Sequence, residues 1–275
     1  IRGRKGYATA FRLADGEIEV AKHPWEPLTR RHRLLNIPII RGTPALLDAL
    51  FVGYRSLMAS ADAAARGEGI KPPSTFQYGL SIAIALSITI GVFVLLPSAV
   101  IERVHLNAFV LNVIEGLIRF CFFVLFILGV SLMPDMRRVF EYHGAEHKVI
   151  NAFEETGRYG EEETGRYGTV HQRCGTSFIF MVLFIGILVH AVVGWPTWYW
   201  RLLSRLLLLP VVAGVSYELV KLAGGHKTSR LLGALVAPGM WLQKITTRQP
   251  SPDQLEVAVR AVDAARELDG ADTAA

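Results

Sequence analysis

The run FQYGLSIAIALSITIGVFVLLPSAV, from Phe76 to Val100, contains no Asp, Glu, Lys or Arg. The hydrocarbon core of a bilayer is about 30 Å thick, and an α-helix needs roughly 20 apolar residues to cross it. This run meets that length and leaves no charged side chain to be placed in lipid. It therefore predicts a membrane-spanning helix.

Three further runs are also long and mainly apolar: Leu106–Met133, Thr176–Trp200 and Leu202–Ala223. The first of these is interrupted only by Glu115 and Arg119, which are spaced i, i+4. At that spacing the two side chains can pair and face the interior of a helix bundle. We therefore expect a mainly α, polytopic membrane protein with about four transmembrane helices.

Lysine and arginine are distributed unevenly around these spans. The segments before, between and after the two pairs of spans are basic, whereas the short loops 101–105 and 195–201 are poor in both residues. Because basic loops stay in the cytoplasm, we expect a multi-pass protein of the cell's inner membrane with its basic segments on the cytoplasmic side. An aromatic belt at the opposite interface is expected from Trp195, Trp198 and Trp200.

The chain has 275 residues, of which 51% are hydrophobic, and a net charge of +5. Basic residues that flank spans and meet anionic lipid explain this modest charge, so we expect the lipid bilayer as a partner and no nucleic acid. The chain begins at Ile1 rather than at a methionine, so we expect N-terminal sequence to be missing, and there is no cleavable signal peptide pattern. The oligomeric state is left open.

Four segments outside the spans have recognisable patterns. Alternating residues on either side of Asp15-Gly16 predict a small β-hairpin. Thr43–Ala65 predicts an amphipathic helix that lies on the membrane. Leu231–Trp241 is too short to span and is expected to be interfacial or re-entrant. Ser251 should cap a soluble amphipathic helix, followed by a disordered tail from Gly270.

These expectations divide the chain into six parts. They are 1–42 (N-terminal β-hairpin and basic segment), 43–73 (interfacial helix and loop), 74–133 (first two spans), 134–175 (cytoplasmic metal-site helix and loop), 176–223 (last two spans) and 224–275 (interfacial segment and C-terminal amphipathic helix).

The segment after the second span contains His-x-x-Glu-His, formed by His143, Glu146 and His147. Residues i and i+4 of a helix lie on the same face, so both imidazoles can reach one ion. The order of the motif is that of the inverted zinc metalloproteases. In such motifs the glutamate acts as general base, although Glu146 could instead be a ligand or a hydrogen-bond partner of an imidazole.

A second cluster, His171 and Cys174, lies just before the third span and therefore at the same membrane face. Imidazole and thiolate together favour a divalent metal, zinc first, although iron or another transition metal also suits them. We expect His143, His147, and His171 or Cys174 as ligands. The alternatives are a polar structural network, or Cys174 as a nucleophile activated by the helix N-terminus that follows it.

Three other polar residues are candidates for a functional or a structural role. Glu154, on the same helical stripe as the two histidines, and Glu218, near the cytoplasmic end of the fourth span, are additional candidate ligands. Glu218 could instead pair with Lys221 at i, i+3. His190, alone in an apolar span, is expected to be a buried hydrogen-bonder.

The sequence Glu-Glu-Thr-Gly-Arg-Tyr-Gly occurs twice, at 154–160 and at 162–168. Two copies are too few for a repeat architecture. We expect the helix that carries His143 to end near Gly157, and the duplicated residues to form an exposed loop without chemistry.

Taken together, the motifs resemble the YqhQ-type family of bacterial multi-pass membrane proteins, whose members are thought to be metal-dependent enzymes without an established reaction. The resemblance covers nearly the whole chain and is carried by EYHGAEHK with Asn151, HQRCGTSF, SYEL, PGMWLQ and TTR, at 141–151, 171–178, 216–219, 238–243 and 246–248. A Gly-rich leader usual in the family is absent before Arg2-Gly3, and the duplicated segment departs from the family pattern. The resemblance implies a membrane protein with a metal site and names no substrate.

The sequence thus favours a metal-dependent membrane hydrolase that cleaves a membrane-associated peptide or a lipid-linked bond at the cytoplasmic face. The competing class is a non-enzymatic scaffold, or a metal-responsive or transport component, with a structural metal. Transport would further require Glu115, Arg119, His190 and Glu218 to line one path.

Overall fold

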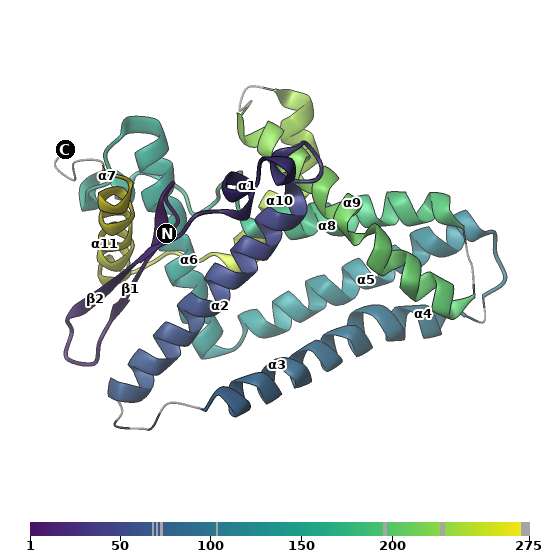
Figure 1. Cartoon of the computed structure of the whole chain (residues 1–275), viewed down its shortest axis with the longest axis horizontal. Helices are drawn as coiled ribbons and strands as arrows, with labels where there is room; N and C mark the ends of the chain where they lie inside the picture. Colours follow the sequence, from purple (N-terminus) through teal and green to yellow (C-terminus); the bar gives the residue numbers. More distant parts are fainter. Residues whose placement is uncertain are drawn as a thin grey trace.

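The computed structural model describes residues 1–67, 69, 71, 74–102, 104–194, 197–225 and 229–270. Apart from one N-terminal antiparallel hairpin, its regular elements are helical (Figure 1). The elements are β1 (Gly6–Arg12), β2 (Ile18–Pro24), α1 (Leu28–Arg31), η1 (Arg33–Asn36), α2 (Gly42–Gly67), α3 (Thr75–Ile90), η2 (Gly91–Leu95), α4 (Leu96–Ile101), α5 (Ala108–Ser131), α6 (Pro134–Thr156), α7 (Glu161–Gly165), α8 (Gly175–Val193), α9 (Trp198–Gly225), α10 (Arg230–Thr246) and α11 (Pro252–Asp269).

Within the described residues, four helices are long and apolar enough to cross a membrane: Thr75–Ile101, Ala108–Ser131, Gly175–Val193 and Tyr199–Gly225. They confirm the mainly α class and the four expected spans. The first contains the π-turn η2 directly before Leu96. Its most apolar window buries no residue in the protein, which suits a helix whose surroundings are lipid. In Figure 1 the spanning helices run beside one another, away from the end that holds both termini.

The hairpin, α6, α7 and α11 form a second packed unit (Figure 1). Ser251 and Gln254 make a capping box at the start of α11, as the sequence predicts for Ser251. The apolar face of α11 packs on α6 through Val149, Ala152 and Leu255. Strand β1 also packs on α11, where Ala8 meets Ala264 and Ala265, so every other element of the unit contacts this helix. Residues 271–275, expected to be a disordered tail, lie outside the described residues.

Helix α10 is longer than the apolar segment visible in the sequence, and it is not among the helices long and apolar enough to span. The residues 231–241 are not a separate short segment but part of a continuous helix that accommodates Pro238 and packs against α8. A Cβ atom at Gly239 would lie 2.9 Å from the Cα of Ser177, so glycine permits the two helices to approach closely. The apolar run was short because buried polar residues such as Gln243 complete the helix.

The start of α2 crosses α9 at an equally close contact. A Cβ at Gly214 would lie 2.1 Å from the carbonyl oxygen of Ile39, a residue with a left-handed φ of 70°. At this crossing Arg41 donates to both carboxylate oxygens of Glu218, at 2.6 and 2.5 Å. Glu218 therefore takes Arg41, rather than Lys221, as its ion-pair partner, and this pair ties the N-terminal segment to the fourth span.

The duplicated segment also differs from expectation. Its first copy ends α6, where Gly157 adopts φ 73° as the C-cap, and its second copy forms α7 and the turn after it. Tyr159 and Thr164 are buried, and Tyr159 belongs to the core between α6 and α11. The segment is therefore part of the packed unit and not simply an exposed loop.

The expected aromatic belt is only partly visible. Trp195 and the side chain of Trp198 lie outside the described residues. Trp200 is exposed and lies 5.9 Å from the ring of Tyr199. Among the side chains that the structure describes, Tyr199 and Trp200 place two aromatic rings at this end of α9.

The close crossing at Gly214 gives a stability prediction. Gly214→Ala should lower the free energy of unfolding by about 1–3 kcal/mol, because the added methyl group overlaps the Ile39 carbonyl. The measurement is thermal unfolding in detergent. Gly129→Ala is the matched control, since a Cβ there meets nothing within 4 Å. Equal melting temperatures for the two variants would contradict the prediction.

Candidate metal centre

Helix α6 begins with Pro134 at its first turn and ends at the left-handed Gly157, as the sequence predicts. His143 and His147 lie on the same face of this helix, with ring centroids 4.4 Å apart. Their helical spacing alone brings the rings together. Their orientation, however, depends on other parts of the chain.

Each histidine is held by a backbone carbonyl from a distant segment. The Nδ1 of His143 donates to the oxygen of Thr246 at 2.8 Å, and the Nδ1 of His147 donates to that of Thr169 at 2.6 Å. Because a carbonyl can only accept, both bonds place the proton of a neutral ring on Nδ1. The lone pair of each Nε2 is then available to a metal, an arrangement typical of metal-ligating histidines.

Cys174 completes the group. It caps the start of α8, where its Sγ accepts a hydrogen bond from the backbone N–H of Thr176, and the same sulfur lies 3.3 Å from Nε2 of His143. One potential ligand atom from each of His143, His147 and Cys174 lies within 4.8 Å of the others. Ligand atoms of a tetrahedral zinc site stand roughly 3.3–3.6 Å apart, so small side-chain movements would suffice to hold one ion.

The electrostatics of Cys174 suit a metal ligand. Burial raises the pKa of its thiol, but hydrogen bonds and electrostatic interactions with His143 and His147 outweigh burial and lower the pKa to about 5. For His143, burial lowers the pKa, but the Cys174 contact outweighs it and the net pKa is raised. A thiolate is therefore present at neutral pH, and Nε2 of His143 is its hydrogen-bond partner. A metal ion would replace the proton of this hydrogen bond.

His171 lies next to this trio without joining it. Its ring is 5.7 Å from that of His147, its Nδ1 accepts from the backbone N–H of Arg173 at 3.3 Å, and its Nε2 lies 3.5 Å from Glu154. Both ring nitrogens are thus engaged elsewhere. Glu154 also accepts from Arg173 at 2.5 Å. The structure therefore brings Cys174, and not His171, to the two helical histidines. Glu154 forms an ion pair with Arg173 and is not part of the trio.

Glu146 is exposed and lines a cavity of about 370 Å³ together with all three members of the trio and His171. A carboxylate at the rim of this cavity can reach a molecule that enters it. Glu218, the remaining candidate from the sequence, is bound to Arg41 and is not part of the trio.

Sequence reasoning missed Gly144, which lies between the two histidines. A Cβ at this position would lie 1.9 Å from the carbonyl oxygen of Arg248, whose N–H donates to the oxygen of Phe140 at 2.9 Å. Only glycine lets the segment after α10 cross α6 here. That crossing also carries the Thr246 carbonyl to His143. A small residue beside a ligand motif was the signal available in the sequence.

The second missed residue is Gln243, which is fully buried on α10. Its amide donates to the oxygen of His171 at 2.9 Å and to Ser177 at 2.7 Å, and its carbonyl accepts from the N–H of His171 at 2.8 Å. Asn151 likewise donates to the oxygens of Gly168 and Val170. These bonds hold the 168–174 segment, and therefore Cys174, against α6.

Comparison with known proteins supports the family. The model of the family described as "Protein of unknown function (DUF1385)" matches residues 37–268, which include both clusters and all four spans. The chain is also 32% identical, over 94% of its length and 86% of the relative, to a protein of Bacillus subtilis (strain 168) described as "Uncharacterized protein YqhQ". The chain belongs to this family. No solved structure matches it.

Membership in the YqhQ-type family confirms the resemblance read from the motifs. The family model begins after the hairpin, so the spans, the trio and α11 belong to the part that the family shares. Neither description names a reaction, so the chemistry has to be argued from the geometry of the site.

The crossing at Gly144 gives a test of the centre. Gly144→Ala should weaken zinc binding by about 10- to 100-fold, because displacing the Thr246 carbonyl releases the ring of His143. Affinity is measured by competition with a chelating dye. Gly160→Ala is the control, since a Cβ there meets nothing within 4 Å. Unchanged affinity in Gly144→Ala would contradict the orienting role.

Proposed function

We propose that this protein is a zinc-dependent membrane hydrolase in which His143, His147 and Cys174 hold the metal and Glu146 is the general base. One observation carries the proposal: three ligands of the types that zinc prefers converge beside a cavity that a further carboxylate lines. A catalytic zinc site has three protein ligands and one open position, whereas a structural site is closed by four.

The position of His171 argues against the structural alternative. A closed site would need His171 as the fourth ligand, but its nitrogens face Arg173 and Glu154. The transport alternative would need Glu218 to share a path with Glu115, Arg119 and His190. Glu218 is instead tied to Arg41. The contacts of His171 favour a site with an open position, and the Arg41–Glu218 pair argues against the transport path.

The residues of the proposed centre have separate roles in hydrolysis: some hold the metal, one transfers protons, and others orient the ligands. A zinc ion bound there would lower the pKa of a water molecule to about 7. Glu146, at the rim of the same cavity, is placed to take the proton of the attacking water and to return it to the leaving group. The Thr246 and Thr169 carbonyls keep both imidazoles aligned, so that no ligand has to reorient during turnover.

An adjoining cavity favours a lipid-linked substrate over a peptide. It has a volume of about 570 Å³ and shares Cys174 with the metal centre at the start of the third span. Its lining is basic, with Asp48 as the one carboxylate among the described residues that form it. An anionic group next to the scissile bond would fit this wall. The cationic residues of the lining are Arg2, Arg30, Arg173 and Lys221.

We place this activity at the cytoplasmic face of the inner membrane. Cys174 directly precedes α8, and α6 directly follows α5, so the centre lies at the end of the spans where the basic segments lie. Because basic segments flanking spans remain in the cytoplasm, that end would be the cytoplasmic one. The substrate would therefore be reached from the inner leaflet.

The ligand assignment predicts a distinct pattern of metal content. Wild type and His171→Ala should contain near-stoichiometric zinc, and the His143→Ala/His147→Ala variant should lose it while keeping its helical content. Elemental analysis of detergent-purified protein measures this. Loss of zinc in His171→Ala alone would indicate a closed site and overturn the open one. No zinc in any of the three would overturn the metal centre.

The base assignment is tested separately. Glu146→Gln should keep the metal and lower kcat by about 10²- to 10⁴-fold, because the amide cannot accept a proton. Assays would use liposomes with labelled lipid-linked phosphoesters, beside a membrane-tethered peptide. Glu155→Gln, at an exposed position of the same helix, is the control. Full turnover by Glu146→Gln with its metal retained would refute the base role.

A further inference from the structure

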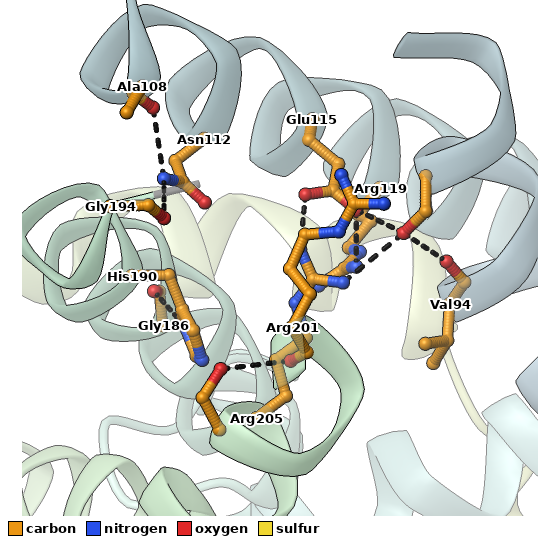
Figure 2. Close-up of polar contacts among 12 residues, drawn as sticks. Val94, Ala108, Asn112, Glu115, Arg119, Gly186, His190, Gly194, Arg201 and Arg205 are labelled. Carbon is orange, nitrogen blue, oxygen red and sulfur yellow. Dashed lines mark hydrogen bonds and ion pairs between the residues drawn. The ribbon is translucent and has the colours of Figure 1, made fainter. Parts of the chain in front are cut away.

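A second polar site lies inside the span bundle. A cavity of about 270 Å³ is lined by residues of α5, α8 and α9 and by Val94, and its polar lining includes Glu115, Arg119, His190 and Arg205 (Figure 2). Glu115 lies 16 residues before Ser131, the end of α5 next to the metal centre. That separation is roughly 24 Å along a helix, so this site is distinct from the metal centre.

The cavity has more positive than negative side chains. Arg119 donates to Glu115 at 2.7 Å, and Arg205 also donates to Glu115 and, at 3.2 Å, to Ser98. Figure 2 shows both guanidinium groups meeting at the one carboxylate. Among the described residues that line the cavity, Glu115 is the single acidic one. Two guanidinium groups that remain charged therefore share one carboxylate, and an excess positive charge is left within the bilayer.

Polar atoms in this cavity also remain without partners. The Nε atoms of Arg119 and Arg205 and the Nε2 of His190 are buried and, within the described part of the chain, make no hydrogen bond. Since His190 donates from Nδ1 to the oxygen of Gly186 at 2.7 Å, its neutral ring presents Nε2 as an acceptor. The two N–H donors match a phosphate oxyanion, and the acceptor matches a hydroxyl group carried beside that phosphate. Buried polar groups normally find partners, so these three indicate a ligand.

The rim of the cavity indicates where such a ligand comes from. Most of the lining is apolar, and Leu206 and Leu209 on α9 are 61% and 47% exposed within the fourth span. Exposed leucines at that depth face acyl chains. An anion that enters between them must carry an apolar tail, because a free ion would have to cross the hydrocarbon.

We propose that this cavity binds the phosphate head of an anionic amphiphile that enters laterally from the bilayer. Arg119 and Arg205 donate to the oxyanion, His190 accepts a hydrogen bond from an alcohol hydroxyl of the head group, and the tail lies along α9. Glu115 holds the two guanidinium groups in place and competes with the ligand for them. The site does not depend on the proposed hydrolase activity.

The test measures lipid binding by native mass spectrometry of the full chain in neutral detergent. The probes are phosphatidylglycerol, phosphatidylcholine and inorganic phosphate. Wild type should prefer phosphatidylglycerol, and Arg205→Gln should weaken that binding by about tenfold to a hundredfold, because one charge-assisted contact is lost. Arg205→Lys keeps the charge without the fork and should lose less. Arg55→Gln, on an exposed arginine of α2, is the control.

Glu115→Gln gives the decisive contrast, because it frees both guanidinium groups for the ligand and should tighten phosphatidylglycerol binding. If Arg205→Gln does not fold, this variant and Arg205→Lys still test whether the arginines bind phosphatidylglycerol. Weaker binding in Glu115→Gln would show a purely structural ion cluster and overturn the proposal. Equal binding of phosphatidylglycerol and phosphatidylcholine would overturn it too. Full competition by inorganic phosphate would overturn the amphiphile as the source of the anion.

Discussion

The centre depends on one backbone crossing, where the chain after α10 passes over α6 at Gly144. The absence of a side chain there allows the Arg248 carbonyl to approach α6, and Arg248 then bonds to Phe140. The same crossing brings the Thr246 carbonyl to His143. A third element, the 168–174 segment, supplies the Thr169 carbonyl and Cys174. The rings of His143 and His147 on α6 are therefore oriented by two other segments, the one after α10 and the 168–174 segment.

The bilayer explains why polar residues of this protein gather in a few places. Lipid offers no hydrogen bonds, so each polar group in a span has to find a protein partner or a ligand. Glu115, Ser98 and two arginines satisfy one another only in part, and the unpartnered nitrogens that remain give the cavity its chemistry. At the end of the spans the constraint relaxes, and a solvent-accessible carboxylate such as Glu146 becomes possible.

The two cavities share one feature: each combines basic side chains with a position in or beside a span. The one beside the candidate metal centre has a basic wall at the start of a span, and the one inside the bundle has arginines behind exposed leucines. We propose that each receives an anionic group attached to an apolar tail. In the family described only as having unknown function, these two features give specific residues to examine.

The sequence by itself determined the spans, the capped soluble helix and the helical pairing of His143 with His147, because these follow from hydrophobic length and from the 3.6-residue period. It also indicated the family, through several motifs in order. Only the tertiary structure decided that Cys174 joins the pair while His171 turns to Glu154, and that Glu218 binds Arg41. It alone showed that Arg205 joins Glu115 and Arg119. The physical reason is that residue spacing determines which side chains are neighbours within one helix. Contacts between a loop and a distant helix depend on tertiary packing. Here, glycines at close crossings and buried amides such as Gln243 bring those elements together.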